Sequence, residues 1–516
     1  MSNKLSRRQF AISGAALGFC AITEKRAASA ATEEHRIAVA PDASIGTIRP
    51  ELHSHFAEHL GSCTYGGLWV GRNSRIPNIN GYRRQAVEYL RELGIPVLRW
   101  PGGCFADDYH WRDGIGPAEK RPRDVNIHWG NYTEDNSFGT HEFVGLCRLI
   151  GAEPYLAGNV GSGTPEELRE WVEYRNYPPG SRLSDERAAN GSPEPFKVKY
   201  WGIGNENWGC GGQMRPEEYS GHYRRFANYV RNFGTAPFLI ACGPNRNNKD
   251  WTQKFMETLG GNRRLPNGYA MHYYSNSRVA ATKFTPEAMQ QQFQSFALIE
   301  QAIGEQRGLL DTFDPEKRVG LMVDEWGVWD LMVPEEQQKY GRLWQQITMR
   351  CAVAAALGLN VFHRQAYKLY MCNIAQIVNV LHSILLTEDD KCVRTPTYYA
   401  FELLKPHRGK TAVKVESDER SAVGLSVSAS RENADLVVTL VNPKPNATMS
   451  VRCSLAGKTA SGATARALYH ADLNACNTFD RPNEVVARNH TAAVSGSGVQ
   501  VDLPPLSIVT VSVKLG

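Results

Sequence analysis

Eight apolar, extended-looking runs alternate with helix-like segments through most of this chain, and this alternation limits its fold most strongly. The runs read as nearly continuous apolar stretches, which is typical of parallel strands that are buried on both faces. They span residues 51–56, 95–103, 153–160, 198–207, 238–245, 268–274, 319–327 and 360–367. Eight strands that alternate with helices predict a (β/α)8 barrel, and a doubly wound sheet is the alternative.

The helix-like segments between these runs carry clear start signals. Thr164 can cap a helix, Pro165 suits its first turn, and Glu167 completes a capping box. Thr285 and Pro286 open a later segment in the same way. These signals support a crossover helix between strands.

The pattern changes after about Pro406. The segments "ADLVVTLVNPKPNATMSVRCSL" and "GVQVDLPPLSIVTVSVKLG" alternate apolar and polar residues and are broken by Pro, Asn and Gly. This pattern is typical of an antiparallel β-sandwich. We therefore expect an α/β fold with a barrel over 51–405 and a sandwich over 406–516, with strands of 31–50 joining the sandwich.

The first 30 residues have the composition of a targeting segment. A twin-arginine pattern, "SRRQF", precedes the apolar "AISGAALGFCAI" and the small-residue segment "AASAA". The apolar stretch is too short to span a bilayer stably, so no stable membrane anchor is expected. The sequence predicts a signal peptide over 1–30 and export by the twin-arginine route to the periplasm or the outside of the cell.

The charge balance and the cysteine spacing exclude two classes of partner. The formal net charge of +5 falls to +1 once residues 1–30 are set aside, which argues against nucleic acid. The remaining ten cysteines form no CxxC pair and no metal-ligand spacing, so no metal or other cofactor is expected. Most of them are interpreted as small buried residues, and disulfide connectivity cannot be deduced from their spacing.

Two of the apolar runs end in a carboxylate that is surrounded by aromatic, amide and glycine residues. The first is "VKYWGIGNENWGCGGQM", which delivers Glu206, and the second is "VGLMVDEWGVWD", which delivers Glu325. Catalytic residues of a (β/α)8 barrel lie at the carboxyl ends of its strands. A carboxylate pair across one pocket is the requirement for breaking a glycosidic bond, with one group as acid and the other as nucleophile.

Two other classes of function compete with this interpretation. His53 and His55 share one face of the first run, as in metal-dependent barrel amidohydrolases, but the fifth and eighth runs supply no further histidine and aspartate ligands in the expected places. A non-catalytic carbohydrate-binding protein is the third class, and the presence of both Glu206 and Glu325 argues against it.

Six motifs give the chain a specific resemblance to the α-L-arabinofuranosidases of glycoside hydrolase family 51. They are "HFAEHLGSCTYGGLW", "LRWPGGCFADDYHWRDGIGP", "YWGIGNENWG", "MHYY", "VDEWGVW" and "NIAQIVNVL", and they cover the chain after residue 30 in this order. The resemblance implies a catalytic barrel beside a β-sandwich and hydrolysis with retention through a glycosyl-enzyme intermediate. It makes Glu206 the general acid/base and Glu325 the nucleophile.

The same resemblance assigns sugar-binding and positioning roles to eight further residues. Glu58 would accept hydrogen bonds from furanose hydroxyls, and Asn205 would contact the 2-hydroxyl. Arg99 would approach the nucleophile and keep it ionised. The others are His272 and Tyr274 on one face of a strand, Gln376 completing the pocket, Trp329 as an aromatic wall, and Cys104, where many relatives have asparagine, so that no strong hydrogen bond from it is expected.

These expectations define the substrate more coarsely than the chemistry. The resemblance implies an exo-acting enzyme that removes terminal α-L-arabinofuranosyl residues from an oligo- or polysaccharide, and a related glycosidase that acts on another glycan such as β-glucan is the runner-up. The sequence leaves the oligomeric state open. A homo-oligomer is possible because relatives often assemble, but symmetric interfaces leave no clear signature in one sequence.

Overall fold

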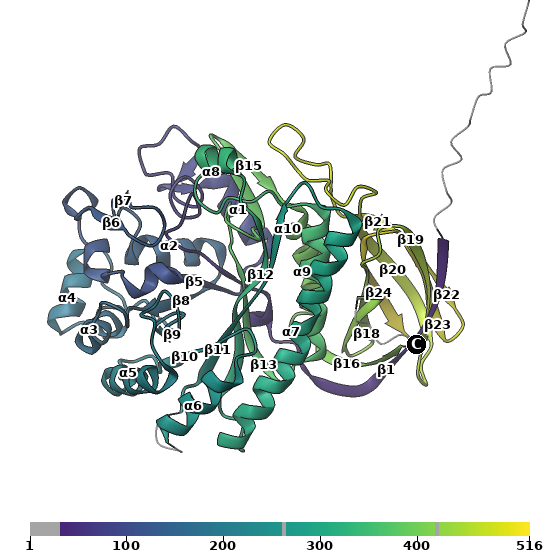
Figure 1. The fold of residues 1–516 in the computed structure, drawn as a ribbon, viewed down its shortest axis with the longest axis horizontal. Coiled ribbons are helices and arrows are strands. Elements are labelled where there is room, and N and C mark those ends of the chain that lie inside the picture. Colours follow the sequence, from purple (N-terminus) through teal and green to yellow (C-terminus); the bar gives the residue numbers. More distant parts are fainter. Residues whose placement is uncertain (1–30, 261–264, 418–422) are drawn as a thin grey trace, which may run out of the picture.

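The computed structural model describes residues 31–260, 265–417 and 423–516. These residues form a closed barrel and a ten-stranded sheet, which lie side by side (Figure 1). The predicted signal peptide over 1–30 lies outside the described residues. Within them, no helix combines the length and the apolar character that a bilayer crossing requires.

The barrel consists of eight parallel strands, and the predicted fold class is confirmed. The sheet closes in the order β10-β11-β12-β13-β2-β5-β8-β9. Its strands are β2 (Ser54–Phe56), β5 (Val97–Trp100), β8 (Glu153–Gly158), β9 (Tyr200–Ile203), β10 (Phe238–Asn245), β11 (Gly268–Ala280), β12 (Gly320–Leu331) and β13 (Leu369–Ala375). Strands β11 and β12 are the longest and continue as a pair beyond the others, towards the rim where the candidate site lies.

Helices surround the barrel and connect its strands. They are α1 (Arg84–Leu93), α2 (Thr140–Ile150), α3 (Pro165–Asn176), α4 (Arg182–Ala189), α5 (Pro216–Tyr229), α6 (Lys249–Leu259), α7 (Pro286–Phe313), α8 (Pro334–Tyr340), α9 (Met349–Arg364) and α10 (Pro396–Leu404). Thr164 and Thr285 cap α3 and α7 with their side chains, as their start signals predict.

One strand prediction is wrong. Residues 360–367, which we expected to form the eighth strand, belong mostly to α9, and the eighth strand is β13. Helix α9 lies between the barrel and the ten-stranded sheet and is buried at every position from Met349 to His363. A helix that is buried all round has no polar face, so its apolar run cannot be told from a buried strand by periodicity.

The barrel interior changes from apolar to polar along the strands. Seven strands contribute one residue each to a buried layer, namely Val97, Tyr155, Tyr200, Ile240, Ala270, Met322 and Met371. Side chains two residues apart on a strand point to the same side, so the next inward positions include Arg99, Asp324 and Asn373. The strands thus deliver a polar layer just before the rim.

The second part of the molecule is a mostly antiparallel sheet with its own apolar core. Its strands are β1 (Ala31–Thr47), β16 (Thr411–Ser417), β17 (Ser426–Glu432), β18 (Asp435–Asn442), β19 (Ala447–Leu455), β20 (Ala460–Tyr469), β21 (Arg488–His490), β22 (Ala492–Ser495), β23 (Gly498–Leu503) and β24 (Ser507–Leu515). The first strand, β1, pairs antiparallel with β16 and parallel with β19 before the chain enters the barrel. The precise domain boundaries at residues 50 and 405 stay a prediction.

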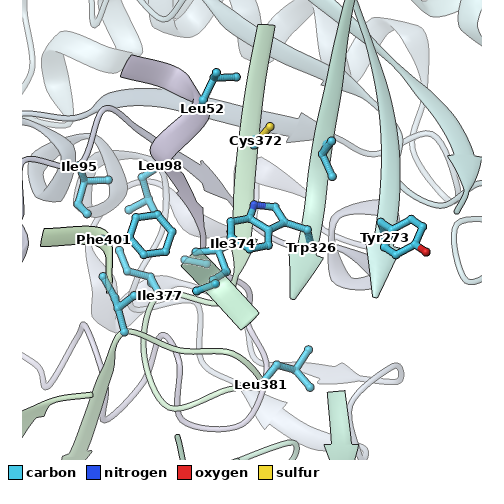
Figure 2. Close-up of a cluster of buried hydrophobic side chains, with 14 of the residues drawn as sticks. Leu52, Ile95, Leu98, Tyr273, Trp326, Cys372, Ile374, Ile377, Leu381 and Phe401 are labelled. Carbon is cyan, nitrogen blue, oxygen red and sulfur yellow. The ribbon is translucent and has the colours of Figure 1, made fainter. Parts of the chain in front are cut away.

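Apolar packing outside the barrel holds β12 and β13 in place (Figure 2). Trp326 follows Glu325 and is fully buried. Its ring lies 5.0 Å from the Phe362 ring of α9 and 6.2 Å from the Phe401 ring of α10, measured between centroids. Fully burying a large side chain stabilises a fold by roughly 1.5–3 kcal/mol, so this anchor fixes the strand that carries Glu325.

Candidate active site

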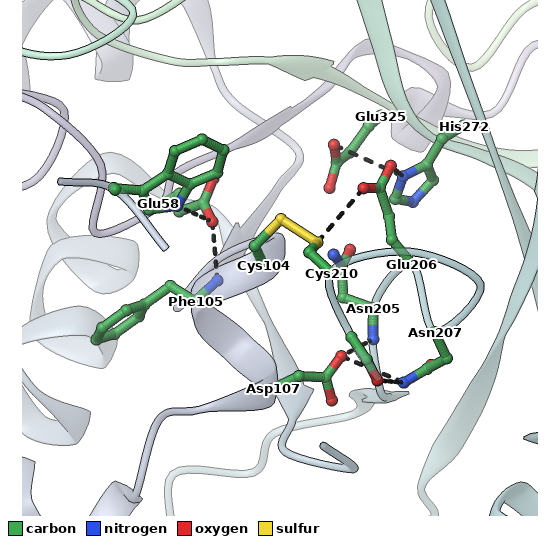
Figure 3. Close-up of a disulfide and its surroundings, with 12 residues drawn as sticks. Glu58, Cys104, Phe105, Asp107, Asn205, Glu206, Asn207, Cys210, His272 and Glu325 are labelled. Carbon is green, nitrogen blue, oxygen red and sulfur yellow. Dashed lines mark hydrogen bonds and ion pairs between the residues drawn. A yellow bond between two sulfur atoms is a disulfide. The ribbon is translucent and has the colours of Figure 1, made fainter. Parts of the chain in front are cut away.

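The two carboxylates singled out in the sequence lie in one pocket at the rim of the barrel (Figure 3). Glu206 follows β9, and Glu325 lies inside β12, which continues to Leu331. The pocket is lined by Glu58, Leu60, Gly103, Cys104, Trp129, Glu206, Trp208, Asn245, Arg246, Tyr274, Asn276, Glu325, Trp329, Leu343, Gln376 and Leu381. Acidic, amide and aromatic side chains therefore converge on it from most of the barrel strands.

A local irregularity in β12 brings two consecutive acidic side chains to the barrel interior. Met271 of β11 pairs with Val323 of β12, and the next residue, His272, pairs with Glu325. Asp324 is therefore an extra residue in β12. Such a bulge turns successive side chains away from strict alternation. Asp324 accordingly contacts Arg99 and the Tyr155 hydroxyl inside the barrel, while Glu325 reaches the pocket.

Glu325 is held by three side chains from two strands, β5 and β11. Arg99 Nη1 donates to Glu325 Oε1 at 2.9 Å, and the Tyr274 hydroxyl donates to Oε2 at 2.8 Å. His272 Nδ1 lies 3.6 Å from the same Oε2. Arg99 also contacts Asp324 and donates to the Asn205 amide oxygen, so it ties the two halves of the site together.

The charges around Glu325 favour its ionised form. Burial acts to raise its pKa, but the positive charges of His272 and Arg99 and the hydrogen bonds from Tyr274 and Arg99 outweigh burial, so the pKa lies below the ordinary value. Burial also acts against protonation of His272, yet the charge of Glu325 and the contact with Glu206 raise the pKa of that imidazole. The site therefore favours the ionised form of Glu325 and the protonated form of His272.

Glu206 sits in a tight turn rather than in a strand. Its φ of 42° is in the left-handed region, which a non-glycine residue adopts only when its surroundings impose it. The amides of Gly209 and Gly211 donate to the Glu206 carbonyl at 2.6 and 3.2 Å and close the turn. His272 Nδ1 bonds to Glu206 Oε1 at 2.8 Å, so the same imidazole contacts both carboxylates.

Asp107 fixes the turn that carries Glu206 by hydrogen bonds to the residues on both sides of it. Its carboxylate accepts hydrogen bonds from the Asn205 amide at 2.7 Å and from Asn207 Nδ2 at 3.3 Å. It also accepts from the amides of Val160 and Gly161, at 2.7 and 3.0 Å, so it connects the loops after β5, β8 and β9. Burial raises the pKa of Asp107 to about 7, and the three backbone amides oppose that shift.

Glu58 forms the opposite wall of the pocket. Its Oε1 accepts from the Phe105 amide at 3.1 Å and from Trp129 Nε1 at 2.9 Å, and its Oε2 accepts from Gln376 Nε2 at 3.1 Å. Burial and the charge of Glu325 raise the pKa of Glu58 to about 7. Gly103 lies between the two acids, where a Cβ atom would approach Glu325 Oε1 to 3.0 Å.

The aromatic side chains complete the walls. The Trp329 ring meets the Tyr274 ring edge-on, with centroids 5.5 Å apart. Trp208 donates its indole N–H to the Gly243 carbonyl at 3.0 Å, which fixes the ring beside Glu206. Flat apolar rings next to amides and carboxylates suit a ligand that has a C–H surface and several hydroxyls.

A disulfide links two of the loops that form the pocket. Cys104, in the turn after β5, is bonded to Cys210, in the turn after β9, with Cα atoms 5.4 Å apart (Figure 3). The Cys210 sulfur lies 3.6 Å from Glu206 Oε2. Sequence reasoning left this pairing open, although both cysteines fall within motifs that it singled out.

All ten site residues named from the sequence lie together. Seven line the pocket, and Arg99, Asn205 and His272 contact the lining carboxylates or each other just behind it. His53 and His55 do not line it; both are fully buried, and His53 Nε2 lies 2.8 Å from His363 Nε2. The individual roles of the ten residues stay predictions.

Sequence reasoning missed several residues of the site. Trp129, Trp208 and Arg246 line the pocket, and Asp107 supports it. Trp208 and Asp107 lie inside quoted motifs and could have been noticed there. Trp129 comes from the short hairpin of β6 (Asp124–Asn126) and β7 (Tyr132–Glu134), and its loop carries no motif.

The arrangement places two carboxylates and one imidazole within reach of a single bond. One oxygen of Glu206, one of Glu325 and a nitrogen of His272 all lie within 4.8 Å of one another. A second group, formed by Cys104, Cys210 and Glu206, meets the same limit. Among the described residues, these two sets have the spacing of metal ligands, but the second offers no thiolates while its cysteines form the disulfide. The first set also suits acid/base and nucleophilic chemistry.

Comparisons with protein families agree with this chemistry. The family model described as the α-L-arabinofuranosidase 1 domain matches residues 89–297, and the one described as the α-L-arabinofuranosidase C-terminal domain matches residues 324–507. An intracellular exo-α-L-arabinofuranosidase from Bacteroides ovatus is 42% identical over 494 residues, which cover 93% of this chain and 95% of the relative.

Solved structures agree as well. The crystal structure of the glycoside hydrolase family 51 arabinofuranosidase from Xanthomonas axonopodis pv. citri matches with a TM-score of 0.88 and 36% identity, over 93% of this chain and 100% of that one. An α-L-arabinofuranosidase from Thermotoga maritima, solved as an arabinose complex, matches with a TM-score of 0.83 and 28% identity over the same shares.

The export prediction is wrong. The Bacteroides ovatus relative, which matches over 93% of this chain, is named an intracellular enzyme. The prediction depended on a short pattern in residues 1–30, and such addresses are read by receptors rather than fixed by packing. The fold does not constrain such residues, so a pattern that arises among them by chance cannot be tested by whether it fits the structure.

Proposed function

The chain belongs to the α-L-arabinofuranosidases of glycoside hydrolase family 51, and on this premise we propose that it releases terminal α-L-arabinofuranosyl residues by double displacement, with Glu325 as nucleophile and Glu206 as general acid/base. It is an exo-acting glycoside hydrolase, as the Bacteroides ovatus relative is named. The stereochemical course and the two roles are the content of the proposal.

The separation of the two carboxylates carries the proposal. Oxygens of Glu206 and Glu325 lie within 4.8 Å of each other. Retaining glycosidases hold their carboxyl groups about 5–5.5 Å apart, whereas inverting ones need about 6.5–9.5 Å to admit a water molecule. The short separation supports direct attack by a carboxylate on the anomeric carbon.

In the first half-reaction the anionic Glu325 attacks the anomeric carbon while Glu206 gives a proton to the departing oxygen. Arg99 and His272 keep Glu325 ionised, and Tyr274 fixes the orientation of its carboxylate. The negative charge on Glu325 disappears as the glycosyl ester forms. His272 stays bonded to Glu206 Oε1, which leaves Oε2 for proton transfer.

In the second half-reaction Glu206 takes a proton from water, which attacks the glycosyl ester from the side that the leaving group vacated. Two displacements restore the original configuration. The turn that carries Glu206 is open enough for this role, since 18% of its side chain is exposed against 7% for Glu325.

The opposite wall supplies the sugar contacts. Glu58 and Gln376 are already bonded to each other and can share furanose hydroxyls, and Trp329 offers a flat face to the ring. We propose that the bound group is one arabinofuranosyl unit at the end of an oligo- or polysaccharide. The part of the ligand beyond that unit would meet Trp129, Trp208 and Arg246.

The stereochemical test is the anomer that forms first from an aryl α-L-arabinofuranoside, observed by proton NMR before mutarotation. The proposal predicts α-L-arabinofuranose as the first product. Initial formation of the β-anomer would show inversion and would remove the covalent intermediate. An enzyme that is folded but inactive on this substrate would contradict the activity itself.

A further inference from the structure

The Cys104–Cys210 disulfide lies against the general acid/base rather than in the core (Figure 3). Both sulfur-bearing residues are partly exposed, and so is Glu206. The other described cysteines, with the exception of Cys476, are buried. The pair is therefore the set of sulfur atoms that reagents in the pocket can reach.

The Cys210 sulfur and one Glu206 oxygen are spaced like two ligands of one metal ion. Cys210 Sγ and Glu206 Oε2 are 3.6 Å apart. A tetrahedral zinc ion with bonds of about 2.3 Å to sulfur and about 2.0 Å to oxygen places two such ligands about 3.5 Å apart. Cys104 Sγ is bonded to Cys210 Sγ in the disulfide and lies within 4.8 Å of a Glu206 carboxylate oxygen, so it can serve as a third ligand once reduction lets the two sulfur atoms separate.

Glu206 presents the appropriate oxygen. His272 bonds to Oε1, and among the described residues no N–H or O–H group donates to Oε2. The imidazole would thus hold the carboxylate from behind, as groups next to metal ligands commonly do. A water molecule would complete the four ligands.

We propose that reduction of the Cys104–Cys210 disulfide creates an inhibitory site for a thiophilic divalent cation such as Zn²⁺ or Cd²⁺, with the two thiolates and Glu206 as ligands. A dithiol reductant supplies two electrons and two protons to the S–S bond, forms two thiols, and is itself oxidised to a cyclic disulfide. The cation then displaces the two thiol protons into solvent as it binds.

Inhibition follows from the role of Glu206 and so depends on the proposed function. A cation on Oε2 removes the oxygen that gives and takes the proton, while Glu325 stays in place. Loss of general acid/base catalysis costs roughly 10²–10⁴-fold in rate. Because disulfides persist in oxidising compartments and are reduced in cytosol, the enzyme would respond to these cations only in a reducing compartment.

The test uses Cd²⁺, whose bonds to thiolates absorb in the ultraviolet. Enzyme is reduced with dithiothreitol, desalted without oxygen, and titrated with Cd²⁺, while absorbance and turnover of an arabino-oligosaccharide are followed. The oxidised enzyme is titrated in parallel. We expect one Cd²⁺ per chain in the reduced protein, at least about a 10²-fold loss of turnover, and recovery on adding a chelator.

Variants locate the site. Reduced Cys210→Ser and Cys104→Ser enzymes, each compared with its own cadmium-free activity, should lose the absorbance and most of the inhibition. Cys476→Ser is the matched control, because Cys476 is a partly exposed free cysteine outside the pocket, and it should respond as the wild type does. Because the reduced and oxidised wild-type proteins have one sequence, the comparison between them stays informative even if a variant folds poorly.

Three results would overturn the proposal. Equal inhibition of oxidised and reduced enzyme would place the cation at Glu206, His272 and Glu325 instead. Unchanged absorbance in the two pocket variants would place it at another thiol. Binding to the pair without loss of turnover would refute inhibition, and this result is separate from the stereochemical test of the proposed function.

Discussion

The strand that carries Glu325 and the turn that carries Glu206 give two glutamate side chains opposite surroundings. Glu325 lies inside β12, accepts hydrogen bonds from Arg99 and Tyr274, and is backed by the buried Trp326. Glu206 lies in a turn of left-handed backbone and has one imidazole partner. Fixed positive charge makes one carboxylate a stable anion, and access to the pocket lets the other exchange protons.

The difference shows that surroundings, rather than residue type, decide which acid does which step. A nucleophile must stay ionised and aimed at one carbon atom. An acid/base must meet a leaving group and later a water molecule at the same oxygen. Substitutions that remove either carboxylate, or that weaken the groups that hold it, should therefore have different effects on the two steps.

Removal of Glu325 should have the largest effect. Glu325→Gln keeps the size of the side chain but removes the attacking anion, so turnover should fall by at least about 10⁴-fold for every leaving group. Initial rates on an aryl arabinofuranoside and on an arabino-oligosaccharide measure this. Glu300→Gln on α7, which breaks a partly exposed ion pair with Arg364 of α9, should leave both rates unchanged; a comparable loss there would point to general instability.

Removal of Glu206 should depend on the leaving group. Glu206→Ala should slow the oligosaccharide by about 10²–10⁴-fold, because its leaving group needs a proton, and should slow glycosylation by an activated aryl substrate far less. Added azide should accelerate the aryl substrate and give the α-arabinofuranosyl azide, with retained configuration. Equal losses on both substrates, with no effect of azide, would deny Glu206 its role.

Replacing Arg99 by lysine should shift the pH profile of kcat/KM. Glu325 attacks as the anion, so activity falls as the pH drops through its pKa, which the wild-type site holds below the ordinary value. Arg99→Lys loses the planar contact with Glu325 and Asp324, so the acidic limb of kcat/KM should move to higher pH. Arg187→Lys, at a buried arginine bonded to carbonyls of other loops, should leave the limb in place. An unmoved limb in Arg99→Lys would make Arg99 a purely structural residue.

Weakening the support of the turn should give the smallest effect. Asp107→Asn replaces an acceptor by an amide that cannot accept from all four N–H donors, at a cost of roughly 1–3 kcal/mol of stability. Turnover of the oligosaccharide should fall about 10-fold more than that of the aryl substrate, since only Glu206 is displaced. Asp314→Asn, which affects a buried aspartate bonded to the Val319 amide, should lower the melting temperature without this selectivity. Equal losses on both substrates would remove Asp107 from the positioning of Glu206.

Most of the barrel could be predicted because its strands are short, apolar and separated by capped helices. Thr164 and Thr285 start their helices as their signals indicate. The eighth strand could not be placed, because α9 is buried all round and reads like a strand. Local periodicity reports the environment of a segment, and a helix between two sheets has the environment of a buried strand.

The site was predictable where motifs carry it and not where tertiary structure builds it. Glu206 and Glu325 stand at the ends of recognisable apolar runs. The bulge that turns both Asp324 and Glu325 inward is visible only from the register of β11 and β12. Trp129 comes from a hairpin without a motif, and the Cys104–Cys210 bond joins residues 106 positions apart. Such contacts depend on loops whose course the sequence pattern does not define.

Trapping the glycosyl-enzyme tests the assignment of the two carboxylates most directly. In Glu206→Ala, an activated aryl arabinofuranoside should glycosylate the enzyme quickly, and without a base the ester should hydrolyse slowly and accumulate. Intact-protein mass spectrometry should then show one added arabinofuranosyl group, and peptide mapping should locate it on Glu325. An adduct on any other residue, or rapid turnover with no adduct in this variant, would contradict the account.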